Sequence, residues 1–232
     1  MSTNTIITIE RQYGSGGHLI GEKLAESLGI PFYDSELIKV AAKESGICEE
    51  IFESFDEKPT TSFLYSLVMD PYSLGYNSNS FDLPLNHKVF LAAFDTIKEL
   101  ASKGPCVFVG RCADYALSEY KDCFSVFVHA DIDWRINRLS QKHNKTAKEA
   151  KDMINKTDKS RSSYYNYYTN KKWGAASSYN LCVDSSKLGI DGAAKAIIQA
   201  IEIFDSIKIN RIIFLQILYH ILGKVSVFWM NL

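Results

Sequence analysis

The feature that most constrains the fold is a glycine-rich segment between an apolar strand pattern and an amphipathic helix pattern. Ile6–Ile9 is β-branched and apolar on both faces, which is typical of a strand buried in a parallel sheet. Gly14-Ser15-Gly16-Gly17 follows, and an apolar stripe after it predicts a helix that ends at Gly29. The stripe consists of Leu19, Ile20, Leu24 and Leu28. Such a loop can bind phosphate, because its N–H groups converge and the helix N-terminus adds partial positive charge.

The rest of the chain alternates short apolar segments with segments of helical spacing. The further strands are predicted at Phe32–Tyr33, Cys106–Val109, Phe124–His129 and Leu181–Asp184. The helices are predicted at Glu36–Glu44, Lys88–Ser102, Asp133–Gln141, Ala147–Tyr168 and Ile190–Phe204. This order predicts an α/β fold, a doubly wound sheet of five parallel strands flanked by helices over residues 1–205. Ligands of such sheets bind at the carboxyl ends of the strands.

Composition narrows the class of protein. The chain has 232 residues, which suits one domain, and a formal net charge of -1, which argues against nucleic-acid binding. Its five cysteines are dispersed and include no C-x-x-C pair, so we expect free thiols. No secretory signal pattern opens the chain, and we expect a cytoplasmic protein. His87, His129 and His143 lack ligand spacing, so no metal site made of protein histidines is expected.

Two segments depart from the regular pattern. Residues 56–86 lose periodicity, and we interpret them as an insertion over the acceptor site. Residues 206–232 form an apolar appendage of about membrane-spanning length. Lys224 within it costs about 2.5 to 3.5 kcal/mol on insertion scales, which disfavours a membrane span. We expect a helix packed on the body or on a second subunit, a homodimer, with a membrane anchor and a poorly ordered tail as alternatives.

Several motifs resemble those of the cytidylate kinases. Thr8–His18 aligns without gaps onto the phosphate loop of that family, and Leu24–Leu28 continues in step. Phe32–Ser35 resembles its acidic-serine motif, Val109–Arg111 its Gly-Arg motif, and Asp158–Arg161 its Asp/Arg-rich segment. The similarity covers about residues 5 to 204 and is greatest to a divergent bacterial branch of these P-loop nucleoside monophosphate kinases.

The resemblance implies an ATP- and Mg²⁺-dependent kinase with a small nucleotide as its partner, CMP or dCMP as acceptor, and a helical lid over about residues 135–173. ATP would be bound by Gly14, Ser15, Gly16, Gly17 and His18. The acceptor would be bound by Ser35, Lys39, Arg111 and Arg161. Catalysis would rest on Asp34, which binds a metal-bound water or orients the acceptor, and on Arg135 and Arg138 from the lid.

The sequence departs from the family pattern in the phosphate loop. The lysine position reads Gly17, the next residue is His18, and the loop's first glycine reads Arg11. Arg11 is the first candidate to supply the missing cation and His18 the second. On the acceptor side, Cys112 replaces an aspartate and Val40 an arginine, so another nucleotide or small metabolite remains an alternative acceptor.

Structural explanations stand beside these functional ones. The glycine loop can be a plain turn, Arg111 can form a surface salt bridge, and Asp34 can cap a helix. A cluster of aromatic residues can stack on a base or pack into the core. The cluster consists of Tyr164, Tyr165, Tyr167, Tyr168 and Trp173. Because the loop lysine is missing, a regulatory protein that binds nucleotide without turnover is the alternative function.

Overall fold

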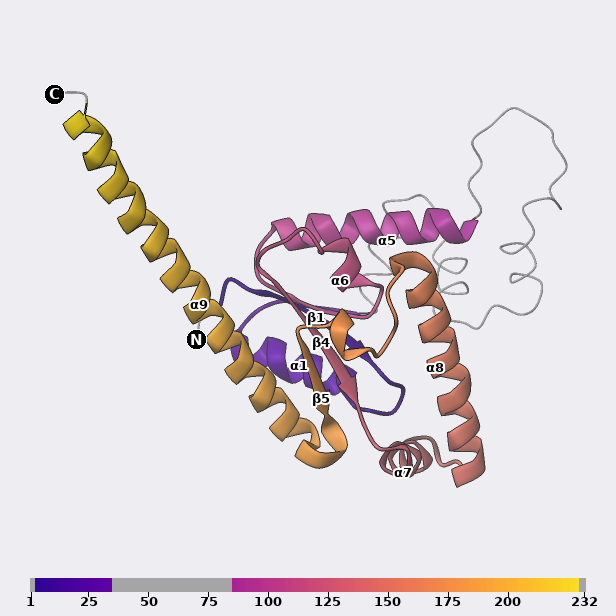
Figure 1. The fold of residues 1–232 in the computed structure, drawn as a ribbon. Coiled ribbons are helices and arrows are strands. Elements are labelled where there is room, and N and C mark those ends of the chain that lie inside the picture. The colour runs from indigo at the N-terminus through magenta and orange to yellow at the C-terminus, as the bar shows by residue number, and fades with distance from the viewer. Residues whose placement is uncertain (1–2, 35–84, 230–232) are drawn as a thin grey trace, which may run out of the picture.

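The sheet of this protein contains five parallel strands, and the order across it is β2-β3-β1-β4-β5 (Figure 1). The computed structural model describes residues 3–34 and 85–229. Its strands are β1 (Ile6–Arg11), β2 (Phe32–Tyr33), β3 (Val107–Val109), β4 (Cys123–His129) and β5 (Leu181–Asp184). The five predicted strands are confirmed, with small differences at their ends.

Strand β1 lies at the centre of the sheet, and all six of its residues are buried. It pairs with β3 through Ile9 and Val109, and with β4 through Arg11 and Val128. Because all strands are parallel, their carboxyl ends meet at one edge. The segments that follow β1, β3 and β4 therefore lie side by side there.

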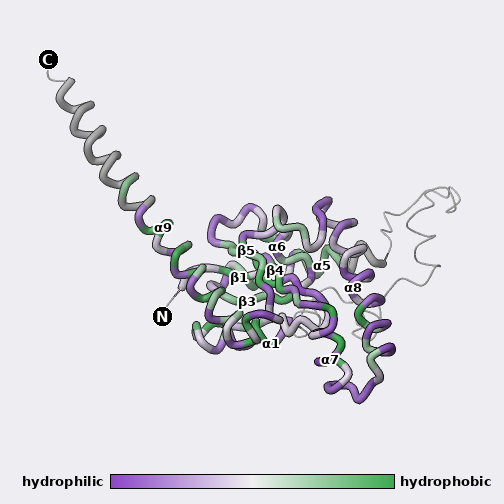
Figure 2. Tube along the Cα trace, turned by 60° about the horizontal axis from the view of Figure 1, so that its bottom comes forward, coloured by the Kyte–Doolittle hydropathy of each residue, from purple (hydrophilic) through white to green (hydrophobic). Residues whose placement is uncertain are grey.

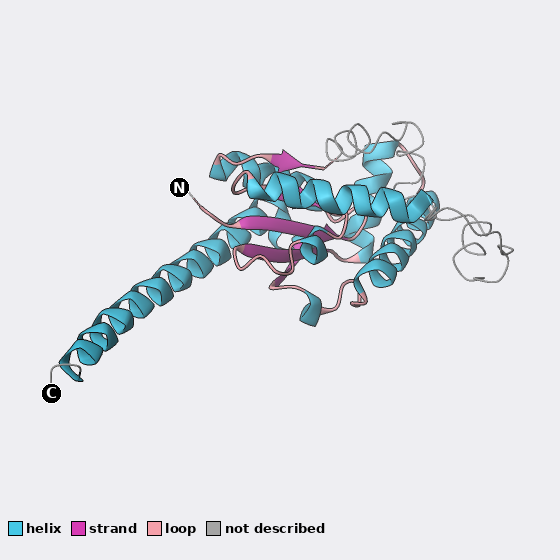
Figure 3. Cartoon of the chain, turned by 90° about the horizontal axis from the view of Figure 1, so that it is seen from above, coloured by secondary structure: helices cyan, strands magenta, loops and turns pink. Residues whose placement is uncertain are grey.

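Helices cover both faces of the sheet (Figures 1 and 3). Helices α1 (Gly17–Leu28) and α9 (Ser185–Trp229) pack on one face, and α5 (Leu85–Ser102) with the short α6 (Ala113–Ala116) packs on the other. A methyl group at Gly21 would lie 2.9 Å from Val109 Cγ2, so the absence of a side chain allows α1 to approach the sheet closely.

A pair of helices stands at the carboxyl edge of the sheet. Helix α7 (Ile132–His143) is capped by Asp131, and α8 (Ala147–Thr169) begins with a capping box between Thr146 and Glu149. A 3₁₀ turn, η1 (Ala176–Ser178), connects α8 toward β5. Both helices agree with the predicted ranges.

Two predictions about helices were wrong. Leu19 is 40% exposed, because the buried face of α1 is formed by small residues, Gly17, Gly21 and Ala25, together with the larger apolar ones. The helix predicted to end at Phe204 continues to Trp229, and only Gly189, with φ 69° and ψ 175°, interrupts it near its start. Helix α6 was missed because four residues carry no periodicity.

Helix α9 is fastened to the body and then leaves it. The Asp205 carboxylate accepts hydrogen bonds from Thr3 Oγ1 at 2.7 Å and Thr5 Oγ1 at 2.5 Å, and Lys208 Nζ lies 2.7 Å from Asp122 Oδ1. Beyond this point the helix projects away from the domain (Figures 1 and 2). The expectation that the tail packs on the body was therefore wrong. None of the helices, over the part of the chain described, has an apolar stretch suited to crossing a membrane.

Candidate functional site

The phosphate loop connects β1 to α1 through residues 12–16. Gly14 has φ 81° and Gly16 has φ 82°, a left-handed conformation that side chains rarely adopt. Between them, Ser15 donates to the Gln12 carbonyl from both N–H (3.3 Å) and Oγ (2.8 Å), which forms a tight turn. Gly16 then serves as the N-cap of α1 without a capping side chain.

The N–H groups of this loop are available to an anion. Within residues 3–34 and 85–229, the backbone N–H groups of Gly14, Gly16 and Gly17 donate no hydrogen bond. The first turn of a helix leaves such donors without intrahelical acceptors, and the helix dipole adds partial positive charge. The geometry therefore favours the predicted phosphate loop over a plain turn.

The outer side of the loop is held by distant segments. Asp158 of α8 accepts from the Tyr13 N–H at 2.7 Å and from Arg135 Nη1 at 2.6 Å, and Arg135 Nη1 also lies 3.4 Å from the Tyr13 carbonyl. On the other side, Ser185 Oγ lies 2.6 Å from the Ser15 carbonyl. Arg135, a predicted lid arginine, is buried and engaged in fixing the loop in this arrangement.

Arg138 borders the same loop from α7. Its guanidinium carbon lies 3.9 Å from the position that a Cβ on Gly16 would take, and 5.7 Å from the ring centre of Trp134. In the described part of the chain no carboxylate forms an ion pair with Arg138. This half-buried cation therefore lies beside Gly16 in the loop.

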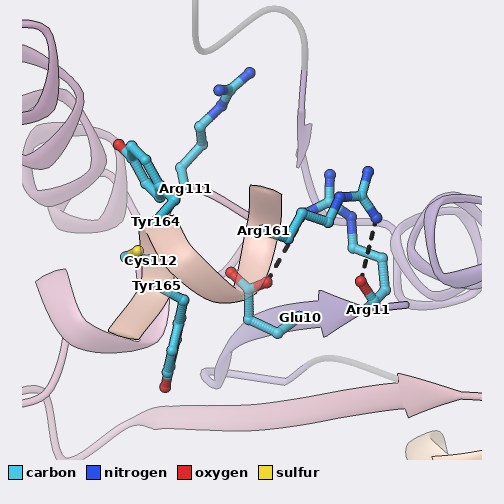
Figure 4. Close-up of a pocket in the computed structure, with 7 residues that line it drawn as sticks. All are labelled: Glu10, Arg11, Arg111, Cys112, Arg161, Tyr164 and Tyr165. Carbon is cyan, nitrogen blue, oxygen red and sulfur yellow. Dashed lines mark hydrogen bonds and ion pairs between the residues drawn. The ribbon is translucent and has the colours of Figure 1, made fainter. Parts of the chain in front are cut away.

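Three arginines line a pocket next to the loop, at the carboxyl ends of β1 and β3, and the Arg111 side chain extends away from Arg11 and Arg161 (Figure 4). Arg161 Nη1 donates to the Arg11 carbonyl at 3.1 Å, and Arg11 Nη1 lies 3.9 Å from Glu10 Oε2. Arg111 follows β3, and the pocket also touches Cys112 and two tyrosines of α8. The structure thus brings the predicted residues Arg11, Arg111 and Arg161 together.

The positive charges that line this pocket favour the binding of an anion. Burial lowers the pKa of Arg111 to about 10; Tyr164 and Asp34 counter this, while the charges of Arg11 and Arg161 add to it. An anion among the three cations would relieve that repulsion. Arg111 and Cys112 also have positive φ, 63° and 53°, which costs roughly 1–2 kcal/mol for each residue. Such backbone strain tends to occur at functional sites.

His18 and Asp34 form a pair across the entrance to α1. His18 Nε2 lies 2.9 Å from Asp34 Oδ2, and His18 Nδ1 lies 3.6 Å from Glu22 Oε2. The hydrogen bond with Asp34 raises the pKa of His18 against the opposing effect of burial. Asp34 therefore faces the phosphate loop. The helix that it was alternatively expected to cap lies outside the described residues.

Some of the other predicted site residues lie outside the described part of the chain, and one of the predicted aromatic residues lies in the core. Ser35, Lys39, Val40 and the predicted helix at 36–44 lie outside the described residues, as does the insertion up to residue 84. Tyr165 is buried, and its hydroxyl donates to Asp114 at 2.7 Å, which favours the core explanation for this tyrosine. Tyr164 and Tyr165 both line the arginine pocket.

Glu10 and Ser185 were not anticipated from the sequence. Glu10 lies near the end of the buried strand β1 and accepts from Trp173 Nε1 at 3.4 Å. An acidic residue directly after an apolar run is the signal that could have identified it. No sequence signal pointed to Ser185. In the described ranges, no group of three His, Cys, Asp or Glu side chains is arranged to hold a metal ion.

The sheet order, the glycine loop after β1 and the arginines at the carboxyl edge define a P-loop kinase fold. The chain belongs to the cytidylate kinase-like family, whose model matches residues 6–187. A crystal structure of an uncharacterized protein from Eubacterium ventriosum is 29% identical, with a TM-score of 0.64 over 85% of this chain and 98% of that chain.

A more distant structure supports the fold alone. A gluconokinase from Sinorhizobium meliloti is 14% identical, with a TM-score of 0.51 over 91% of this chain and 99% of that chain. No curated protein matches the chain. The family indicates a phosphotransferase of nucleotides or small metabolites.

Proposed function

We propose that this protein transfers the γ-phosphoryl group of ATP to a nucleoside monophosphate, with CMP or dCMP as the first candidates. The observation that carries the proposal is the pocket of Arg11, Arg111 and Arg161 directly beside a loop with open N–H groups. One half of this site suits a donor triphosphate and the other a phosphorylated acceptor. The family to which the chain belongs supports the choice of acceptor.

The donor side is formed by the loop and α7. The N–H groups of Gly14, Gly16 and Gly17 would surround the β-phosphate, and Arg138 beside Gly16 would add a cation. Helix α7 also packs over Gly14 through Leu139, which keeps water from that side of the loop. The protein thus binds and orients the triphosphate with preformed groups, which reduces the reorganisation needed at the moment of transfer.

The acceptor side is the arginine pocket. A guanidinium binds a phosphate through two parallel hydrogen bonds, and Arg111 is the best placed to do so because it lies in the pocket after β3. Tyr164 lies against the same pocket and gives an apolar surface next to the charges. In-line transfer needs little covalent chemistry from the protein, so positioning and neutralisation of charge supply most of the rate.

Mg²⁺ fits the same site. Proteins hold this ion with one or two carboxylates, waters and the substrate's phosphates rather than with a complete set of side-chain ligands. Asp34 is the candidate carboxylate, because it contacts His18 at the start of α1. When bound, the ion would neutralise charge on the phosphates.

Measurement of ADP formation with a panel of acceptors tests the proposal. The panel includes CMP, dCMP, UMP, AMP, GMP and a non-nucleotide sugar acid. Turnover that is greatest with CMP or dCMP supports the proposal. Turnover that is greatest with the non-nucleotide acceptor would show instead that the protein is a metabolite kinase. ATP binding without turnover on any acceptor would establish the alternative, a nucleotide-binding regulatory protein.

A further inference from the structure

Arg11 and Gly17 are in contact, although they lie on different elements. Arg11 ends β1 and Gly17 begins α1. A Cβ atom placed on Gly17 would lie 2.5 Å from Arg11 Cβ and 3.0 Å from Arg11 Cγ. Real Cβ atoms essentially never come closer than 3.0 Å to another heavy atom. The atom in the way is the root of the arginine side chain, which cannot move without the strand. Any residue larger than glycine at position 17 is therefore incompatible with Arg11.

These are two of the positions at which the loop departs from the kinase pattern it resembles, lysine being replaced by Gly17 and glycine by Arg11. The contact means that the two departures are not independent. It also means that the Arg11 side chain starts within 2.5 Å of the point at which a side chain on residue 17 would start. A cation from β1 thus leaves the backbone at almost the same place as the missing lysine would leave α1.

The rest of the Arg11 side chain leads toward Gly110, which follows β3. Arg11 is 7% exposed, and its guanidinium lies against Gly110, where an added Cβ would collide with Nη1. Gly110 follows β3 and precedes Arg111 of the acceptor pocket. The charge of Arg11 also acts on His18 at the start of α1, since it opposes the rise in the pKa of that histidine. The guanidinium is therefore located between the phosphate loop and the acceptor arginines.

We infer that Arg11 and Gly17 are a coupled exchange, in which the last residue of β1 supplies the phosphate cation that a loop lysine supplies from α1 in other kinases of this fold. The inference rests on the proposed function for its chemistry, and on the contact for its geometry. An arginine stays charged at every physiological pH and binds phosphate oxygens in pairs, so it replaces the lysine charge and adds orientation.

The steric half of the inference is tested by stability, without any substrate. Four proteins are compared by thermal unfolding: the natural chain, Gly17→Ala, Arg11→Gly and Arg11→Gly/Gly17→Ala. Arg11→Gly is used rather than Arg11→Ala because alanine keeps the Cβ that causes the collision. Gly17→Ala is expected to lower the Tm of the natural chain by about 5 °C and not to lower the Tm of Arg11→Gly. An equal effect of Gly17→Ala in both backgrounds would overturn the coupling.

The chemical half is tested by exchanging the residues back. Arg11→Gly is expected to lower kcat by about 100-fold or more, and Arg11→Gly/Gly17→Lys is expected to recover about tenfold or more of that loss, because lysine then has room to enter the site. A folded double variant that is no better than Arg11→Gly would overturn the inference. Unfolding curves of both variants establish that they are folded.

Failure of the proposed function gives a different result. If the natural chain transfers phosphate to no acceptor, the proposed kinase activity is wrong, and ATP affinity measured by calorimetry on the same variants then decides the inference. Loss of affinity in Arg11→Gly and recovery in the exchanged variant support it. Equal affinity in all of them overturns it.

Discussion

The Asp158 carboxylate accepts a hydrogen bond from the Tyr13 N–H at 2.7 Å, although 145 positions separate the two residues in the sequence. The same carboxylate holds Arg135 Nη1 at 2.6 Å. Helix α8 thus fixes the first half of the phosphate loop, and the segment expected to act as a lid is also part of the loop's support.

Asp158→Asn is expected to destabilise the protein by about 3 kcal/mol, because it removes one charge of a mostly buried ion pair and leaves Arg135 uncompensated. The affinity for ATP should fall as well, since the loop loses its support. Chemical denaturation and calorimetric titration with ATP measure the two effects. Arg135→Met combined with Asp158→Asn is the control, because removal of both charges should recover part of the stability. An unchanged free energy of unfolding in Asp158→Asn would show that the ion pair contributes nothing.

Arg111→Ala is expected to raise the KM of the acceptor by about tenfold or more and to leave the affinity for ATP nearly unchanged, because Arg111 lies on the acceptor side. Arg111→Gly should have the same kinetic effect but be more stable than Arg111→Ala by about 1 kcal/mol, since the backbone here has φ 63°. Steady-state kinetics with both substrates and thermal unfolding separate the two effects. An equal loss of ATP affinity would place Arg111 on the donor side.

Arg138→Ala is expected to lower kcat by about 100-fold, because it removes a cation beside Gly16 in the loop. Binding of ATP should also draw the guanidinium away from the Trp134 ring, which lies 5.7 Å from it. The tryptophan fluorescence of the natural chain should then change on addition of ATP, and that of Arg138→Ala should change much less. Trp134→Phe is the control that assigns the signal. A fluorescence change that persists in Arg138→Ala would contradict this placement.

Stability should depend on pH through His18, whose pKa is raised by its hydrogen bond with Asp34. A raised pKa in the folded state stabilises the protein fully below the ordinary histidine value of about 6.5, and this contribution is lost as pH rises through the folded value. The effect should be small, because the His18 side chain is 48% exposed. A histidine NMR titration is the direct measurement, and Asp34→Asn should move the pKa of His18 back downward. An unaltered titration in Asp34→Asn would exclude the hydrogen bond as the cause.

The projecting part of α9 is expected to pair with a second copy of the chain. Ile203, Ile207 and Phe214 are exposed and lie within about 40° of one direction around the helix, whereas Ile209 lies about 140° away. Ile207→Asp should therefore shift the protein from dimer to monomer, and Ile209→Asp should not. Ile209→Asp is a matched control, because Ile207 and Ile209 are 60% and 57% exposed. Light scattering after gel filtration measures the mass. A monomeric natural chain would refute pairing, and co-sedimentation with lipid vesicles would indicate a membrane surface instead.

The phosphate loop and the sheet could be predicted from the sequence because their signals are local. Ile6–Ile9 and Gly14–Gly17 are each a run of neighbouring residues, and the strands are short apolar runs. The support of the loop could not be predicted in this way. The contact between Asp158 and Tyr13 depends on how α8 returns over the sheet, and no periodicity encodes that path.

The positions of the arginines could likewise be predicted only in part. Arg11 and Arg111 follow predicted strands at the edge where ligands bind, so their meeting could be expected. Arg161 lies within the long helix Ala147–Thr169, and its place in the pocket depends on the path of that helix. Arg135 and Arg138 are three positions apart on one helix, yet one is buried against Asp158 and the other borders Gly16. A sequence pattern gives their shared helix but not the rotation of that helix against the loop.

The hydrogen bonds from Thr3 and Thr5 to Asp205 have a consequence for the order of folding. They span 202 and 200 positions, and they join the start of the central strand β1 to the helix that completes the domain. During synthesis β1 emerges first, but its neighbours β3 and β4 and its anchor on α9 emerge much later. Strand β1, which is apolar, therefore has no partner strand to pair with during most of translation. The phosphate loop that follows it should be among the last parts of the molecule to acquire its final shape.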